Sequence, residues 1–318
     1  MAIIMASDIK TAITHFTRRC WWQATLALAL NWGPIILMAC VAERWPYLYP
    51  LAVLVISSRM LGLYELAHEA LHYNLFQNRK WNDRLDLFYA IPFFYRVADE
   101  RHDHLIGHHK MLDEEKAQPD YGYQYFYLNP QRIDNPAYMV WVLFGRPLLG
   151  FHVLTQIITM LKDIWAYRTD AAMWLFHGAL ALILTVCSAW NFYLWYWLVP
   201  YLTVYPVLWF WQDMLTHFKA RDPSGSRDTR HWLCTLLLSP HHFATYHTLH
   251  HAWPTVPWFA MQEANKCLMD DNQTVCTHSI FEAFRQMIMP YPSPTSAGQV
   301  TLNTQPTACN SGQSLPSL

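Results

Sequence analysis

The apolar positions of this chain gather into long runs that predict membrane-spanning helices. Residues 20–42 contain no charged side chain, and a second run, residues 46–64, carries only Arg59 near its end. Residues 171–212 then stay uncharged for long enough to cross a bilayer twice. A helix needs about 20 apolar residues to span the hydrocarbon core. The pattern therefore predicts an all-α integral membrane protein with about four transmembrane helices in two hairpins.

One further apolar stretch is weaker. Residues 137–161 are interrupted by Arg146 and Pro147, which is more typical of an interfacial or half-buried helix than of a span. The tip of the second hairpin is expected at residues 188–191, where Ser, Ala, Trp and Asn replace the long apolar side chains.

The distribution of basic residues predicts the orientation. Four spans place the N-terminus and every long loop on one side of the membrane. All but two of the 22 Lys and Arg residues then fall on that side, because Arg44 lies in a far-side loop and Arg59 within a span. Cytoplasmic loops carry the excess of basic residues in membrane proteins. We therefore expect a multi-pass protein with both termini in the cytosol.

Composition supports this class and excludes others. The chain is 53% hydrophobic and only 14% charged, whereas average soluble chains carry about 25% charged residues. A net charge of −1 gives no indication of nucleic-acid binding. The seven cysteines include no CxxC pair, so a zinc ribbon is not predicted.

The chain divides into three parts by the same criteria. Residues 1–19 form a cytosolic N-terminal segment and residues 20–290 a single membrane domain. Residues 291–318 lack charge and are rich in Pro, Ser, Thr and Gln, which predicts a disordered tail.

The candidate chemistry lies in three short histidine clusters on the predicted cytosolic side. Their members are His68 and His72; His104, His108 and His109; and His247, His250 and His251. Imidazole is a good ligand for iron, copper, zinc and nickel. Eight imidazoles exceed what one tetrahedral ion needs and suit a pair of octahedral ions better. His217, which follows the fourth predicted span, is a natural ninth ligand.

The spacing within each cluster fits a dimetal centre held by a cytosolic helical cap. Residues four apart share one face of an α-helix, so His68 and His72, or His104 and His108, can point to one ion. An adjacent histidine such as His109 is rotated by about 100° and can reach a neighbouring ion. Acidic residues beside the clusters are expected to orient the imidazoles. These residues are Glu69, Asp103 and Asp213.

Other interpretations fit these histidines less well. The segment from His68 to His72 also fits the HExxH pattern of zinc proteases, but that motif leaves six clustered histidines unexplained. A membrane metal transporter would place histidines inside the spans, and those spans contain only His177. Whether His102, or the pair His241 and His242, joins the site stays open.

The flanks of the clusters resemble those of the membrane fatty acid desaturase and hydroxylase superfamily. The first box begins His68-Glu-Ala-Leu-His72 and is followed by an Asn-Arg and an Asn-Asp pair, similar to the desaturase pattern HEAxH with an NR…ND segment. The third box reads Tyr-His-Thr-Leu-His-His-Ala-Trp-Pro-Thr-Val-Pro over residues 246–257, similar to YHxxHHxxPxVP. The resemblance covers about residues 20–265.

The resemblance implies a particular chemistry. Members of this superfamily use two non-haem iron ions and O2, and they receive electrons from a ferredoxin or a cytochrome b5 type donor with its reductase. We therefore expect an oxidoreductase that introduces a double bond into an aliphatic chain, most simply a fatty acyl group. The expected partners are the separate electron donor, a lipid or acyl substrate and the membrane.

Two departures leave hydroxylation open. Three residues separate His104 from His108, where many desaturases have two, and the segment ending Gly107-His108-His109 resembles the alkane monooxygenase version EHxxGHH. Thr216 precedes His217 where an acid is common. The alternative is a hydroxylase, monooxygenase or ketolase acting on an alkane, acyl or carotenoid-type substrate. Chain length, head group and regiochemistry are encoded by no motif.

Overall fold

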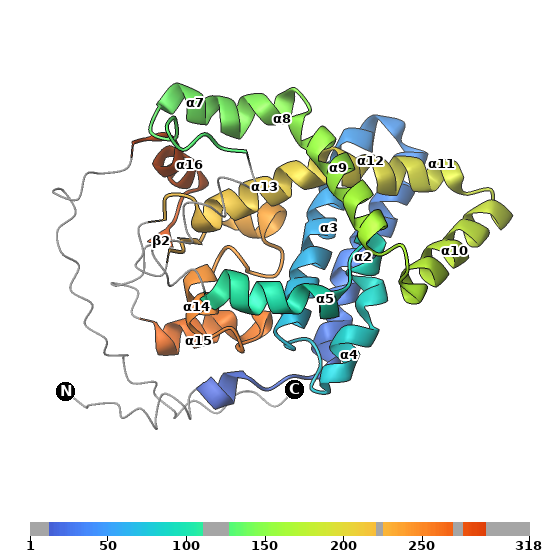
Figure 1. The fold of residues 1–318 in the computed structure, drawn as a ribbon, viewed down its shortest axis with the longest axis horizontal. Helices are drawn as coiled ribbons and strands as arrows, with labels where there is room; N and C mark the ends of the chain where they lie inside the picture. The colour runs from blue at the N-terminus through green and yellow to red at the C-terminus, as the bar shows by residue number, and fades with distance from the viewer. Residues whose placement is uncertain (1–12, 111–126, 221–224, 270–275, 291–318) are drawn as a thin grey trace.

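The computed structural model describes residues 13–110, 127–220, 225–269 and 276–290 (Figure 1). Regular structure in these ranges is almost entirely helical, as predicted. Strands β1 (Asp228–Thr229) and β2 (Cys276–Thr277) form one short parallel pair with Asp228 opposite Cys276. The predicted disordered tail, residues 291–318, and the first 12 residues lie outside the described residues.

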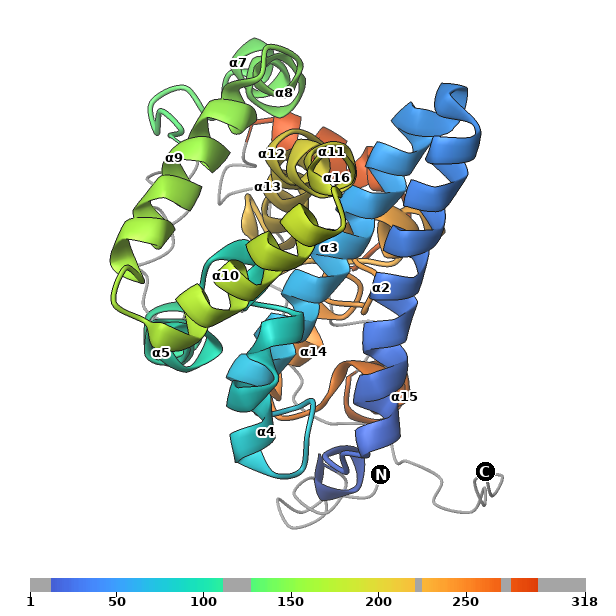
Figure 2. The ribbon, with the colours of Figure 1, turned by 90° about the vertical axis from the view of Figure 1, so that its right-hand side faces the viewer.

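Two long helices, α2 (Trp21–Arg44) and α3 (Tyr49–Leu71), stand side by side (Figure 2). They are joined by the 3-10 turn η1 (Pro46–Leu48). Small residues of α2 are buried at their contact, and Gly62 of α3 lies so close to Asn31 that an added Cβ would clash with its side-chain oxygen. Small side chains let helices approach closely inside a membrane, where packing drives association.

The other face of α2 is apolar and exposed. The residues on it are Trp21, Trp22, Leu26, Leu30, Ile36 and Leu37. An exposed stripe of this kind suits contact with lipid. Among the described residues, α2 and the helix through α3 are long and apolar enough to cross a membrane, which confirms long apolar helices for the first predicted hairpin.

Helix α3 continues further than the sequence predicts. The second span was expected to end near Tyr64, with His68 after it, whereas α3 runs to Leu71 and His72 caps it. Ala, Leu and Glu favour helix after Tyr64, and the polar side chains of this last part are buried inside the protein. The first histidine box is therefore the end of the helix itself.

The second predicted hairpin is not confirmed as two spans. Helix α10 (Ala171–Val186) has 16 residues, or about 24 Å at 1.5 Å per residue, against about 30 Å of hydrocarbon. The chain turns at Ser188, as expected. The return segment is divided by irregular turns and Pro200. Its parts are α11 (Trp190–Tyr193), η6 (Leu194–Leu198), α12 (Val199–Leu202) and α13 (Val204–His217).

The weaker apolar stretch forms a bent pair. Its first arm contains α7 (Pro136–Val140), η5 (Trp141–Gly145) and α8 (Arg146–Leu148), and its second arm is α9 (Phe151–Ala166). The helix direction bends by 69° between the two arms. Together the arms are long and apolar enough for one broken span. Gly150 lies at the bend with a φ of +74°, a left-handed conformation that glycine adopts without strain.

Several of the remaining elements lie near the end of α3 that carries the first box, whereas α16 packs against α7 and α13 (Figure 1). The helical elements are α4 (Arg79–Arg84), η2 (Asp86–Phe88), η3 (Ile91–Phe93), α5 (Val97–His102), η4 (Asp103–Lys110), η7 (Cys234–Leu238), α14 (His247–Ala252), η8 (Trp258–Ala260), α15 (Met261–Leu268) and α16 (Ile280–Ile288). One continuous core of buried apolar residues joins α2, α3, α13 and α16. These elements form the cap that positions the histidines.

Candidate metal centre

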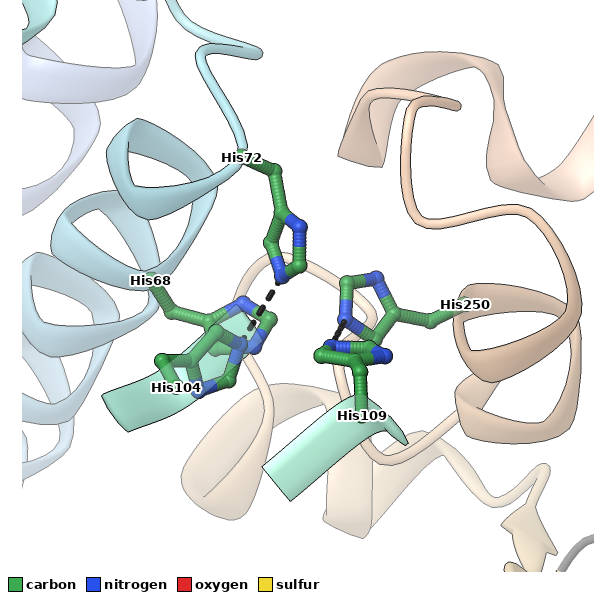
Figure 3. A group of neighbouring side chains, drawn as sticks. All are labelled: His68, His72, His104, His109 and His250. Atoms are coloured by element: carbon green, nitrogen blue, oxygen red, sulfur yellow. Dashed lines mark hydrogen bonds between the residues drawn. The ribbon is translucent and has the colours of Figure 1, made fainter. Parts of the chain in front are cut away.

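Five histidines from three separate elements converge on one point (Figure 3). They are His68, His72, His104, His109 and His250, and one ring nitrogen from each lies within 4.8 Å of all the others. His68 comes from the last turns of α3 and His72 caps that helix, while His104 and His109 come from η4 and His250 from α14. Residues distant in the sequence thus form one polar cluster inside the cap.

A second group of three histidines lies beside the first. His217 at the end of α13 meets His247 and His251 of α14. The Nε2 atom of His247 is 2.8 Å from that of His217 and 3.0 Å from that of His251. The ring centroids of His109 and His251 are 4.7 Å apart, so the two histidine groups are neighbours. Helix α14 divides the adjacent residues His250 and His251 between the two groups.

The ring nitrogens are spaced as metal ligands would be. The Nε2 atoms of His72 and His104 are 2.9 Å apart, and those of His109 and His250 are 3.2 Å apart. A metal bonded to imidazole at about 2.1 Å places neighbouring octahedral ligands about 3.0 Å apart. Buried His68 has no hydrogen-bond partner for either ring nitrogen among the described residues. Because buried polar atoms normally have partners, this donor set fits a metal ion.

The second box is a π-helix, which changes how its histidines are paired. Segment η4 has wider turns than an α-helix, so His104 and His109, five residues apart, point to the same group. The α-helical expectation paired His104 with His108 instead. Single π-turns occur often at functional sites. The side chain of His108 lies outside the described part of the chain, so its predicted role as a ligand stays a prediction.

Burial keeps these imidazoles neutral. Desolvation, followed by the neighbouring His109 and His217, lowers the pKa of His104 to about 3. Desolvation and His217 lower the pKa of His109 to about 4. Burial and the surrounding histidines also hold the pKa of His250 well below its ordinary value. Neutral imidazole is the form that binds metal, so the cluster has its lone pairs available at physiological pH.

Comparison with known proteins agrees with this geometry. The fatty acid desaturase family model matches residues 44–277, which includes all three histidine boxes. The chain belongs to the fatty acid desaturase family. A curated relative, the dihydrorhizobitoxine desaturase of Bradyrhizobium elkanii, is 26% identical over 257 residues, covering 74% of this chain and 71% of that protein. The protein is therefore a membrane oxidoreductase of the desaturase type, with histidine boxes that support an iron site.

A buried carboxylate that sequence reasoning missed ties together three elements of this desaturase. Glu65 lies one turn before His68 and accepts hydrogen bonds from the side chain of Gln212 on α13 and from the backbone N–H of His241 at 2.6 Å. Gln212 also donates to the carbonyl of Leu238 at 2.6 Å. No spacing rule links these residues, because they meet only in the folded cap.

Two arginines donate hydrogen bonds to carbonyl groups at the ends of the helices that carry box histidines. Arg101 donates to the carbonyls of Ala70 and Leu71 at 3.1 and 3.0 Å and pairs with Asp83 at 2.5 Å. The last carbonyls of a helix have no partner within it, so Arg101 of α5 fixes the end of α3. Fully buried Arg227 does the same for α13 through the carbonyls of residues 215, 218 and 219.

The acidic residues predicted to orient imidazoles make other contacts. Glu69 accepts a hydrogen bond from the backbone N–H of Trp258 at 3.0 Å. Asp103 lies 3.3 Å from the ring of His102, which is exposed and belongs to neither group. Asp213 is half-buried on α13, while the Nδ1 atom of His217 faces the carbonyl of Gly225 at 3.3 Å.

The pair His241 and His242 also lies outside both groups. His241 is buried, and its Nε2 atom is 2.7 Å from the side-chain nitrogen of Asn31. Burial lowers the pKa of His241 to about 3. Its contacts join the loop before the third box to α2, so His241 positions this loop.

An open cleft of about 430 Å³ reaches the first histidine group. His68 and His104 form part of its wall, together with side chains from α3, α5, α9 and α13. Polar and acidic side chains line this cleft as well as aromatic ones.

Proposed function

We propose that this protein is an O2-dependent desaturase with two iron ions that introduces a double bond into an aliphatic chain. The observation that carries the proposal is the pair of neighbouring imidazole groups sharing α14. The five-histidine group would hold one ion and the three-histidine group the other, with His108 as the remaining predicted ligand. Among the described residues, both groups consist of imidazoles alone, which distinguishes this site from facial-triad iron sites, where a carboxylate is a ligand.

Two iron ions bound there would supply, with O2 and two electrons, an oxidant strong enough to remove hydrogen from an unactivated C–H bond. The overall change is balanced when the substrate loses two hydrogens and O2, two electrons and two protons give two water molecules. The protein itself positions the substrate. His68 and His104 reach the cleft wall, so a chain lying in the cleft passes directly over the first group.

The aromatic walls of the cleft would fix the substrate and limit water. Phe93, Tyr205 and Trp209 line it together with His68 and His104. Removal of hydrogen from two adjacent carbons requires the chain to stay in place between the steps. A relative named for a desaturation favours double-bond formation over hydroxylation.

We further propose that the histidine face is cytosolic and that a separate ferredoxin or cytochrome b5 type protein delivers the electrons there. The support is the positive-inside bias of the sequence and the position of all described box histidines at one end of the α2–α3 pair. A soluble donor can reach that end from the cytosol.

The deciding experiment is expression in a host followed by mass spectrometry of its lipids and amphiphilic metabolites. We expect a new product two hydrogens lighter than its precursor, and no such product with His68→Ala. A product that instead gains one oxygen would assign the protein to the hydroxylases. Neither change, with an electron donor supplied, would contradict the proposed function.

A further inference from the structure

The walls of the cleft indicate which substrates it favours. Six aromatic side chains line it together with polar and acidic ones. The aromatic residues are Tyr64, Phe93, Tyr95, Tyr201, Tyr205 and Trp209. A simple hydrocarbon would gain little from the polar groups, because they must lose water when it binds. The polar groups therefore predict a polar part in the ligand.

Helix α9 turns its polar face toward the cleft and its apolar face outward. Gln156, Thr159 and Asp163 recur at helical spacing and line the cleft. Leu161 and Trp165, on the opposite face, are 56% and 69% exposed. An amphipathic helix of a soluble protein has the reverse arrangement. A helix that bordered only a hydrocarbon tunnel would have no reason to place an aspartate and a glutamine there.

The charge of the cleft is negative. Three carboxylates line it, Glu100 and Asp103 from α5 and η4 and Asp163 from α9, and no Lys or Arg is among the described lining residues. Two bases that neighbour lining residues in the sequence do not line the cleft themselves: Lys162 is exposed beside Asp163, and Arg96 is paired with Asp86 and Asp170 at 2.6 and 2.8 Å. A wall of one charge sign concentrates ligands of the opposite sign.

An unpartnered hydroxyl supports a ligand at the same place. The Oη atom of Tyr95 is buried and has no hydrogen-bond partner among the described residues, although its ring lines the cleft. A buried hydroxyl without a partner is costly. A ligand reaches this oxygen only when the ring of Tyr95 shifts toward the cleft; an ammonium group can then donate to it, bind the carboxylates and lie against aromatic faces, which attract cations.

We propose that the substrate of this desaturase is an aliphatic amine whose ammonium group binds between Glu100 and Asp163, with its hydrocarbon part directed over the first histidine group. This proposal rests on the proposed function, because it assigns the substrate class of the same site. The amine can belong to a free small molecule or to an aminolipid head group. A carboxylate, a phosphate or a coenzyme A ester is disfavoured by the same charges.

Binding can be tested without turnover. The iron-loaded protein in nanodiscs is titrated with octylammonium, octanoate and octanol, which share one chain and differ in charge, and binding is followed by thermal stability. We expect octylammonium to bind at least tenfold more tightly than octanoate, with octanol between them. Equal or tighter binding of octanoate would overturn the proposal.

Substitutions assign the effect to the carboxylates. Asp163→Asn and Glu100→Gln should each weaken octylammonium binding about tenfold and leave octanol unchanged. Asp99→Asn, which removes an exposed charge from the same helix as Glu100, is the matched control and should bind like the wild type. Iron content is measured in every variant. Loss of iron in Asp163→Asn would assign this carboxylate to the metal and overturn the proposal.

The source of the amine is resolved by changing the lipid. If phosphatidylethanolamine nanodiscs compete with octylammonium and phosphatidylglycerol nanodiscs do not, the ligand is a lipid amine. If neither competes, the ligand is a free amine; both results support the proposal. Failure of the proposed function is separate, because it would appear as absent desaturation while the preference for octylammonium over octanoate remains.

Discussion

At the scale of single residues, the site depends on imidazoles that are held neutral by burial and point their ring nitrogens toward one another. The ring nitrogens of His68 are the clearest case, since both lack a hydrogen bond among the described residues. The sequence identifies these residues because histidine clusters are rare and their spacing is informative. It did not identify Glu65, because a single buried glutamate in an apolar helix carries no local pattern.

His72→Ala and His251→Ala should each abolish desaturation and lower iron content at least tenfold, because each removes one ligand from a different group. Iron is measured by elemental analysis of the purified protein and activity by product mass. His15→Ala, at an exposed position outside both groups, is the control and should match the wild type. Full iron content in both box variants would contradict the ligand assignment.

At the scale of elements, the histidines are placed by the ends of helices. The sequence predicts α2 and α3 well because their apolar runs are long. It predicts the second hairpin less well, because hydropathy counts apolar residues and does not detect that Pro200 and the adjacent π-turn interrupt the return segment. It also missed the π-helix of the second box, since wide and normal turns share the same composition.

The cap that Arg101 forms on α3 can be tested directly. Arg101→Met should lower the free energy of unfolding by about 1–3 kcal/mol, because two helix carbonyls and Asp83 lose their partner. Activity should fall about 10- to 100-fold, the range for residues that support metal ligands. Thermal unfolding in detergent and product formation are measured.

The control for this variant is Arg84→Met on α4, which removes an exposed arginine and should change neither quantity appreciably. If Arg101→Met and Arg84→Met behave alike, the end of α3 is not fixed by Arg101.

At the scale of the whole molecule, α2 and α3 form a hairpin whose turn is distant from the histidines. The membrane class could be predicted from composition, because too little charge is available to cover a soluble surface. The polar cleft could not be predicted from the sequence. Its residues Glu100, Asp163 and Tyr95 lie on different segments and meet only through the bend at Gly150 and the packing of α9.

The orientation of this hairpin predicts opposite exposure for two positions. Tyr47, which is 76% exposed in the turn, should after Tyr47→Cys react with a membrane-impermeant maleimide on intact cells. Arg79→Cys, on the histidine side, should gain labelling over the wild type only after permeabilisation. The reverse pattern would place the histidines outside the cell and contradict the proposed cytosolic donor.

The wide turn of the second box has a consequence for how such chains diverge. His104 and His109 face one point because the backbone accommodates one residue more than an ordinary helical turn. Point substitution cannot move between this arrangement and the shorter boxes of other desaturases; only an insertion or deletion can. Lineages with the two spacings are thus separated by a discrete genetic event, and ungapped motif searches built on one will overlook the other.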